Sequence, residues 1–311
     1  MRVFLVFIDG FGLGRDDPSA NPFLNADLPT FRGLFGGRPV VLDSILPLDS
    51  SGGTETSGDR GAVVVPLDAA LGVPGLPQSA TGQTAILTGI NAPMLAGRHL
   101  NAHPTNALIK IIRKQNVFLN TFQAGKTATF INAYRPEFFR DQPAGTYQAS
   151  ATTVAALSAG LPFRSLEDVR KGRAVYHDIT NWTLIQKGYH VPPVEPEEAG
   201  RRAAQLVRGY DFSMFEYFLT DLVAHEQDLA KAVMVLETLD RFLGAALAEL
   251  DLGGTLVAVV SDHGNIEDLS ARTHTRNPVP AILVGAGREK IVGRLRDLTD
   301  IAPALLEVLK S

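Results

Sequence analysis

The fold class is decided by residues 3–10, which read VFLVFIDG. Six consecutive apolar residues, mostly β-branched or aromatic, predict a strand that is buried on both faces. The run Thr255–Ser261 repeats this pattern and, like the first, leads directly into an aspartate. Strands of this kind occur in α/β proteins whose helices cover both faces of the sheet, so the two runs predict a central, mostly parallel sheet.

Further strands and helices alternate on either side of these runs. The expected strands are Val63–Val65, Thr127–Ile131, Met214–Thr220 and Ala281–Gly285. The expected helices are Thr81–Ile90, Asn106–Ala124, Thr152–Ala159, Pro196–Arg208, a long helix capped by Asp228 and ending near Leu250, and Asp300–Lys310. The alternation predicts a three-layer α/β core.

Residues 134–204 interrupt this rhythm. The stretch is rich in proline and glycine, is short in regular elements and is locally basic. We interpret it as a small inserted cap that sets substrate specificity, with residues 1–133 and 205–311 forming the catalytic core. The alternative is a long surface excursion without a function of its own.

Composition excludes several classes of protein. Of the 311 residues 45% are hydrophobic and 20% charged, so the chain can bury a core. A net charge of −4 gives no nucleic-acid signature. The absence of cysteine excludes disulfides, thiolate-bound zinc, iron–sulfur clusters and a cysteine nucleophile. No apolar run reaches the roughly 18 residues of a membrane span, and none resembles a signal peptide, so we expect a cytoplasmic protein.

Three of the expected strands end at an aspartate: Asp9, Asp221 and Asp262. Because the carboxyl ends of parallel strands meet at one edge of a sheet, these side chains are expected to lie close together. A single aspartate after a strand is commonly a turn or capping residue. The prediction therefore rests on all three together.

Histidines accompany two of these acids. His225 follows Asp221 by four residues, His263 follows Asp262 directly, and His274 lies a short distance further on. Mixed carboxylate and imidazole ligands suit zinc, manganese or iron. Six such ligands are too many for one tetrahedral ion and predict two. The alternative is a set of capping acids and surface histidines.

A two-metal site indicates in-line displacement, most often at phosphorus, which requires a nucleophile. The segment 77–84, PQSATGQT, is rich in hydroxyls and opens a helix, whose terminal N–H groups suit a phosphate. Ser79 is the predicted nucleophile and Thr81 the second choice, since coordination to a dication lowers the pKa of a hydroxyl. Alternatively, either hydroxyl merely caps the helix.

Two further groups of side chains are candidates for binding the substrate. Arg98, His99 and His103 could reach its phosphate, although a solvated loop is the alternative. Arg170 and Arg173 of the cap could hold its non-reacting part, unless they are only part of a solvated face.

Five motifs occur in a definite order: FIDGFG at 7–12, Ser-x-x-Gly at 79–82, Asp-x-x-x-His at 221–225, SDHGN at 261–265 and HTRNPVP at 274–280. Together they resemble the alkaline phosphatase superfamily. The likeness is strongest to its metalloenzyme branch, which includes cofactor-independent phosphoglycerate mutase and phosphopentomutase. It covers roughly the first 90 and last 100 residues, which form the catalytic core.

The resemblance implies an alkaline-phosphatase-like core that binds two divalent ions, manganese or zinc, and a small phosphorylated substrate. One ion would be held by Asp221, His225 and His274, and the other by Asp9, Asp262, His263 and the Ser79 oxygen. The reaction would pass through a phosphoserine.

This chain departs from the mutase pattern in two places. Its nucleophile segment reads SATGQ at 79–83 where the mutase has Ser-Glu-Val-Gly-His, and the cap is smaller and lacks the histidine- and glycine-rich mutase motif. We therefore expect hydrolysis of a phosphate ester. A phosphomutase of the phosphoglycerate or phosphopentose type is the alternative. A non-catalytic metal-binding protein is the second alternative, against which the complete ligand set argues. The sequence indicates no oligomeric state.

Overall fold

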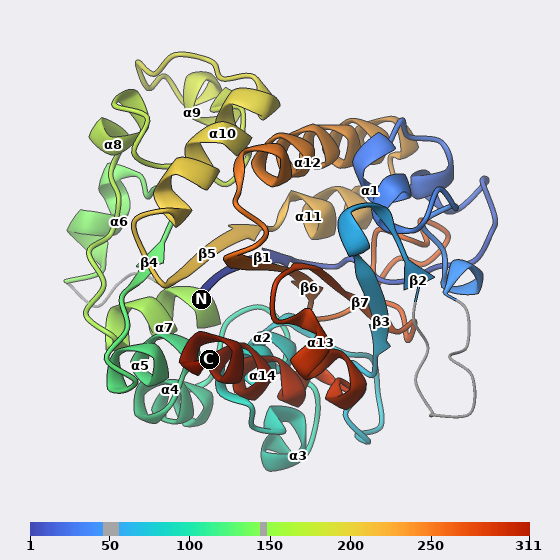
Figure 1. Cartoon of the computed structure of the whole chain (residues 1–311), viewed down its shortest axis with the longest axis horizontal. Coiled ribbons are helices and arrows are strands. Elements are labelled where there is room, and N and C mark those ends of the chain that lie inside the picture. The colour runs from blue at the N-terminus through green and yellow to red at the C-terminus, as the bar shows by residue number, and fades with distance from the viewer. Residues whose placement is uncertain (46–55, 144–147) are drawn as a thin grey trace.

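The computed structural model describes residues 1–45, 56–143 and 148–311, which form a seven-stranded sheet between two layers of helices (Figure 1). The strand order is β2–β3–β7–β6–β1–β5–β4. The strands are β1 (Arg2–Ile8), β2 (Thr56–Ser57), β3 (Val63–Leu67), β4 (Ala128–Phe130), β5 (Phe212–Tyr217), β6 (Thr255–Ser261) and β7 (Val279–Gly285).

The sheet is mixed but mostly parallel, as predicted. β1 pairs in parallel with β5 and β6, and β4 in parallel with β5. β7 runs antiparallel to both β6 and β3, so β3 points the same way as the central strands. β2 is antiparallel to β3 at the edge. The reversal of β7 matters for the site, because it brings the start of β7 to the edge where the parallel strands end.

Alternate residues of β1 feed two separate hydrophobic cores. Phe4, Val6 and Ile8 belong to one core. Val3, Leu5 and Phe7 belong to the other, and all six side chains are almost fully buried. Burial of each large apolar side chain stabilises the fold by about 1.5–3 kcal/mol, so this strand anchors both layers.

Each core is covered by its own set of helices (Figure 1). The first is covered by α1 (Pro29–Leu34), α10 (Pro196–Val207), α11 (Leu219–Glu226) and α12 (Leu229–Glu249). The second is covered by α2 (Ser79–Thr88), α4 (Asn106–Lys114), α5 (Val117–Gln123), α7 (Ala151–Ser158), α13 (Arg288–Ile291) and α14 (Ile301–Lys310). The short α3 (Ala92–Ala96) follows α2. No helix in the described parts of the chain is both long and apolar enough to cross a bilayer.

Two expected elements differ from those observed. The single helix expected over Asn106–Ala124 is two helices, because the Asn116 side chain accepts hydrogen bonds from the N–H groups of Phe118 and Leu119 and so caps a new helix. The strand expected to reach Thr220 ends at Tyr217, and Asp221 lies instead in the first turn of α11.

The segment expected to form the cap is divided between core and periphery. Its helices α7 and α10 pack into the two main cores. The shorter helices α6 (Pro136–Asp141), α8 (Leu166–Arg170) and α9 (Trp182–Gln186) lie at one end of the sheet. Near them a small separate core includes Leu166, Val169, Tyr176, Leu184 and Val191. Residues 134–204 therefore contribute to both main cores as well as to the small separate core.

Candidate metal centre and active site

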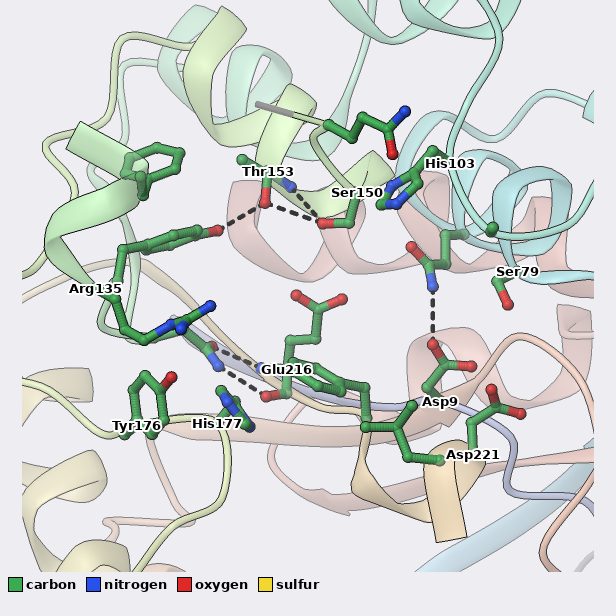
Figure 2. A pocket seen from close by; sticks show the side chains of 18 of the residues that line it. Asp9, Ser79, His103, Arg135, Ser150, Thr153, Tyr176, His177, Glu216 and Asp221 are labelled. Carbon is green, nitrogen blue, oxygen red and sulfur yellow. Dashed lines mark hydrogen bonds between the residues drawn. The ribbon is translucent and has the colours of Figure 1, made fainter. Parts of the chain in front are cut away.

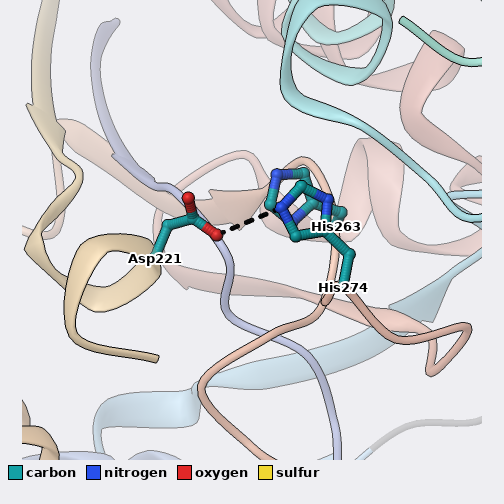
Figure 3. Close-up of side chains that lie close together, drawn as sticks. All are labelled: Asp221, His263 and His274. Carbon is teal, nitrogen blue, oxygen red and sulfur yellow. Dashed lines mark ion pairs between the residues drawn. The ribbon is translucent and has the colours of Figure 1, made fainter. Parts of the chain in front are cut away.

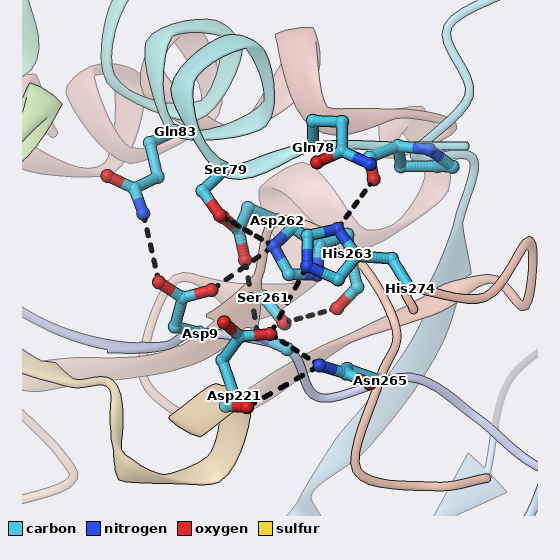
Figure 4. Close-up of polar contacts among 12 residues, drawn as sticks. Asp9, Gln78, Ser79, Gln83, Asp221, Ser261, Asp262, His263, Asn265 and His274 are labelled. Carbon is cyan, nitrogen blue, oxygen red and sulfur yellow. Dashed lines mark hydrogen bonds and ion pairs between the residues drawn. The ribbon is translucent and has the colours of Figure 1, made fainter. Parts of the chain in front are cut away.

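The three predicted aspartates lie at one edge of the sheet, at the ends of the adjacent strands β6, β1 and β5. Asp9 follows β1, Asp262 follows β6, and Asp221 opens α11 just after β5. His274 precedes β7, which runs antiparallel, so it reaches the same edge from the opposite direction. Figure 4 shows these side chains converging from elements far apart in the sequence.

The first group of ligand atoms surrounds His263. Its Nε2 lies 2.9 Å from Ser79 Oγ, 3.2 Å from Asp9 Oδ1 and 3.5 Å from Asp262 Oδ2 (Figure 4). Ligand atoms that share one tetrahedral ion, with bonds near 2.0–2.1 Å, lie about 3.3 Å apart. The four atoms therefore have the spacing of a metal-binding set.

The second group centres on Asp221. Its Oδ1 lies 3.4 Å from His274 Nε2 (Figure 3), and its Oδ2 lies 3.3 Å from His225 Nε2. The rings of His263 and His274 stack with their centroids 3.7 Å apart, which joins the two groups. His225 is the most exposed of these ligands. All seven predicted metal ligands thus meet in one cluster.

The cluster suits cations for two reasons. Some of its buried oxygen and nitrogen atoms have no hydrogen-bond partner, and it carries excess negative charge. Asp9 Oδ1, Asp262 Oδ2 and His263 Nδ1 are buried without a hydrogen-bond partner among the described residues, which is costly for polar atoms. Burial, then the charge of Asp9, raises the pKa of Asp262 well above its usual range. Burial opposes the charged form of His263, but Asp262 and Asp9 outweigh it and raise its pKa to about 10. The acids thus require a positive charge, which a divalent ion provides.

Side chains around the cluster hold the ligands in place. Gln83 Nε2 donates to Asp9 Oδ2 at 3.1 Å, and Asn265 Nδ2 donates to Asp221 Oδ1 at 2.7 Å. His274 Nδ1 donates to the carbonyl of Pro77 at 2.9 Å, which orients the ring so that its Nε2 faces Asp221. Burial opposes ionisation of Asp221, but the hydrogen bond from His274 and the charge of His263 keep its pKa below the usual range.

Glu267 braces the turn that carries the ligands. This carboxylate is almost fully buried and accepts hydrogen bonds from the backbone N–H groups of Gly12 (3.0 Å) and Asn265 (2.7 Å). It also accepts from the Thr275 hydroxyl and, at 2.9 Å, from Asn277 Nδ2. One side chain therefore ties the loop after β1 to the segments on either side of His274.

The geometry of α2 favours Ser79 over Thr81. Ser79 is the first residue of α2 and faces the cluster, whereas Thr81 is fully buried and bonds to Gln78 O (3.1 Å) and the N–H of Leu100 (3.2 Å). The Ser-x-x-Gly motif has a steric cause, because a Cβ on Gly82 would lie 2.7 Å from the carbonyl oxygen of Asp262. The Asp-Gly motif has a similar one, because Gly10 has φ +73° and touches Asp221.

A cavity of about 380 Å³ opens beside the cluster (Figure 2). Asp9, Ser79 and Asp221 form part of its wall, and segments of the cap region form the opposite wall. Glu216 of β5 also lines it. Burial raises the pKa of Glu216 to about 8, against a hydrogen bond from the Thr152 hydroxyl and with a further contribution from the charge of Asp9.

The predicted substrate-binding residues are distributed unevenly around this cavity. His103 lines it, together with Ser79. His99 Nε2 is instead 3.2 Å from Val73 O, and Arg98 is an exposed residue that does not line the cavity.

The structure places the two cap arginines away from this cavity. Arg170 bonds to the carbonyl of His190 and pairs with Glu167, and Arg173 pairs with Asp168. Neither lines the cavity, because both are held by partners on or near α8.

Sequence reasoning missed five residues of the site. Three left a recognisable signal: Gln83 lies one turn after Ser79 on the same helix face, and Asn265 and Glu267 lie within or next to the SDHGN motif. Glu216 is a lone acid within an otherwise buried strand, which is a weaker signal. Arg135 has no sequence signal, because only the fold places it at the cavity.

Comparisons with known proteins agree with this geometry. Residues 186–311 match the family model "Metalloenzyme superfamily". The 2,3-bisphosphoglycerate-independent phosphoglycerate mutase of Synechococcus sp. (strain JA-3-3Ab) is 38% identical over 143 residues, which cover 40% of this chain and 27% of that enzyme. The enzyme of the same name from Agrobacterium fabrum is 35% identical over 126 residues, covering 38% and 25%. The chain thus spans about a quarter of the length of the curated relatives it matches.

Similar solved structures cover the whole chain and support the fold. The PH0037 protein of Pyrococcus horikoshii has a TM-score of 0.59 at 13% identity and covers 100% of this chain and 98% of its own. The alkaline phosphatase of the Antarctic bacterium TAB5 has a TM-score of 0.52 at 14% identity and covers 99% and 98%. The chain is therefore similar to the metalloenzyme family over residues 186–311, and in its overall fold it is similar to an alkaline phosphatase.

Proposed function

We propose that this chain catalyses phosphoryl transfer from a phosphate ester through a phosphorylated Ser79. The observation that carries the proposal is the position of Ser79 Oγ, 2.9 Å from His263 Nε2, at the wall of a cavity and beside three acids. Bound to the two ligand groups, divalent cations would lower the pKa of the serine hydroxyl and offset the charge that develops on the phosphoryl oxygens. The first group is Asp9, Asp262, His263 and Ser79, and the second is Asp221, His225 and His274.

The protein's own groups then have distinct tasks. Ser79 Oγ gives up its proton to solvent and bonds to phosphorus on the side opposite the ester oxygen. The ester P–O bond breaks, and the released oxygen takes a proton from water. The N–H groups at the start of α2 would face the transferred group. Gln83 and Asn265 keep two of the carboxylates oriented. In the second step an acceptor oxygen displaces Ser79 Oγ and takes the phosphoryl group. Mixed oxygen and nitrogen donors suit both manganese and zinc.

The acceptor separates two candidate functions. Transfer to water makes the chain a phosphatase or phosphodiesterase, the outcome expected from the small cap. Transfer back to the bound product makes it a phosphomutase, and the names of the curated relatives favour this second candidate. The matched stretch covers only about a quarter of those enzymes, so their names do not decide between the two reactions. A non-catalytic metal-binding role is disfavoured by the retention of every ligand and of the nucleophile.

The test is a panel of phosphate esters with protein reloaded with manganese or with zinc. The panel contains p-nitrophenyl phosphate, 3-phosphoglycerate and ribose 5-phosphate, and phosphorus NMR follows the products. Release of inorganic phosphate indicates hydrolysis, and an isomeric ester without free phosphate indicates a mutase. Absence of turnover of every ester with either metal, in protein that retains its ions, would contradict phosphoryl transfer.

A further inference from the structure

A cation without a partner lies in the wall of the cavity. Arg135, at the start of α6, is half-buried and lines the cavity. Among residues 1–45, 56–143 and 148–311, no hydrogen bond or ion pair involves its guanidinium group. The neighbouring acid Glu137 accepts a hydrogen bond from the hydroxyl of Tyr189 at 2.6 Å instead.

Other arginines of the same region are bound by the protein. Arg164 donates to the carbonyls of Phe130 and Arg173 and to the hydroxyl of Thr129. Arg170 and Arg173 pair with acids near α8, as described above. Arg135 is the only lysine or arginine among the described residues that line the cavity. The charge of Glu137, which also lines the cavity, attracts Arg135 but makes no ion-pair contact with it. A half-buried guanidinium group without a hydrogen bond is costly, so its position is explained best by a ligand.

The surroundings of Arg135 strengthen an ion pair with such a ligand. The rings of Tyr176, His177 and Phe218 form a continuous row, with centroid distances of 4.2 Å and 4.4 Å, and all three line the cavity. Burial, with a contribution from the charge of Arg135, lowers the pKa of His177 to about 3, so its ring is neutral at pH 7. This aromatic row lowers the local dielectric constant beside Arg135 and favours binding of flat groups.

Figure 2 shows Arg135 across the cavity from Ser79, Asp9 and Asp221. We propose that Arg135 binds a second anionic group, a carboxylate or a phosphate, on the part of the substrate remote from the transferred phosphoryl group, and that a planar scaffold joining the two groups lies against the aromatic row. The preferred substrates are then aryl phosphates with an acidic substituent. This inference rests on the proposed function for the role of the metal end and adds the specificity of the other end. A guanidinium group suits carboxylate or phosphate because it donates two parallel hydrogen bonds.

Binding to metal-loaded Ser79→Ala protein tests the inference without turnover. Titration calorimetry would compare 4-carboxyphenyl phosphate with phenyl phosphate, which lacks only the second anion. We expect the carboxylate to tighten binding by about 10- to 100-fold, the effect of a hydrogen-bonded ion pair. In the double variant Ser79→Ala/Arg135→Gln this ratio should fall to about 2-fold or less, and Arg135→Lys should restore part of it.

Arg170→Gln is the matched control, because it removes the same charge from a residue that does not line the cavity. It should leave the ratio unchanged. The inference is overturned if Arg135→Gln preserves the ratio, or if it weakens both ligands equally. A third ligand, 3-phosphoglycerate, carries both anions on an aliphatic chain. If it binds more tightly than 4-carboxyphenyl phosphate, the planar scaffold is wrong.

Failure of the proposed function can be distinguished from failure of the inference about Arg135. If the parent protein turns over neither aryl phosphate but the binding ratio still depends on Arg135, then phosphoryl transfer is wrong and the anion site stands. If it turns over both with equal kcat/KM and the ratio is absent, phosphoryl transfer stands and the role of Arg135 is wrong.

Discussion

The two walls of the active-site cavity are built in different ways. The catalytic wall lies at the ends of β6, β1 and β5, and four of its side chains, Asp9, Asp262, His263 and His274, are buried. The opposite wall, with Arg135, Tyr176 and His177, comes from the segment after β4, where Tyr176 belongs to a small separate core. The proposed chemistry therefore depends on the ends of the sheet strands, whereas the proposed substrate end depends on the segment that follows β4.

This difference between the two walls leads to a general expectation about variants. Variants in the catalytic wall should lower activity on every substrate or remove metal. Variants in the opposite wall, which we call the cap wall, should change only the discrimination between substrates. Four variants test the comparison, in decreasing order of expected effect.

Ser79→Ala should reduce kcat by about 10³-fold or more on every ester, because it removes the attacking oxygen. Steady-state kinetics on p-nitrophenyl phosphate measures the loss. Thr81→Val is the matched control: it should lower the melting temperature, through two lost hydrogen bonds, and retain turnover. An active Ser79→Ala protein beside an inactive Thr81→Val protein would move the nucleophile by two residues.

Asp262→Asn should lower the metal content from about two equivalents to one or fewer, since it removes charge from a fully buried ligand group. The protein is reloaded with manganese and passed through gel filtration, and elemental analysis then measures its metal content. Glu197→Gln changes an acid that pairs on the surface with Arg241, and should leave the content unchanged. Two retained ions in Asp262→Asn would remove Asp262 from the ligand set.

Asn265→Ala should weaken metal affinity or activity by about 10- to 100-fold, because Asp221 loses the hydrogen bond that orients it. Competition with a chelator gives the affinity. Asn101→Ala, at an exposed loop position, provides the control. Equal affinities of the two variants would show that Asp221 needs no such support.

Arg173→Gln should have the smallest effect, about 2-fold or less in kcat/KM for 4-carboxyphenyl phosphate. Its partner is Asp168, and the guanidinium group itself is exposed, so loss of the pair costs at most about 1 kcal/mol of stability. A 10-fold loss would restore the sequence-based assignment of the substrate anchor to this arginine and contradict the assignment to Arg135.

The catalytic wall could be predicted from sequence because local sequence patterns specify the strands that carry it. Asp9 and Asp262 each follow a fully apolar strand, so their convergence at the sheet edge is fixed by the rules for parallel strands. The motif glycines add information, because Gly82 is required by the contact of α2 with Asp262. The order of the motifs singled out seven side chains, the proposed nucleophile Ser79 among them, that lie close together in the structure.

The cap wall could not be predicted in the same way. A run of basic residues indicated Arg170 and Arg173 as substrate-binding residues. A sequence does not show which cations already have an acidic partner, and both of these arginines have one. Arg135 stands beside a proline at the start of a short helix, a pattern shared by many surface residues. Its importance depends on long-range placement opposite Ser79, which no local pattern encodes.

The most direct test of the central claim is to trap the phosphoserine. Metal-loaded protein is mixed with labelled p-nitrophenyl phosphate, quenched in acid within the first turnover, digested and analysed by mass spectrometry. The account predicts phosphate on the peptide that contains Ser79, and none on that peptide from Ser79→Ala protein. Phosphate on another residue, or sustained turnover by Ser79→Ala protein, would contradict it.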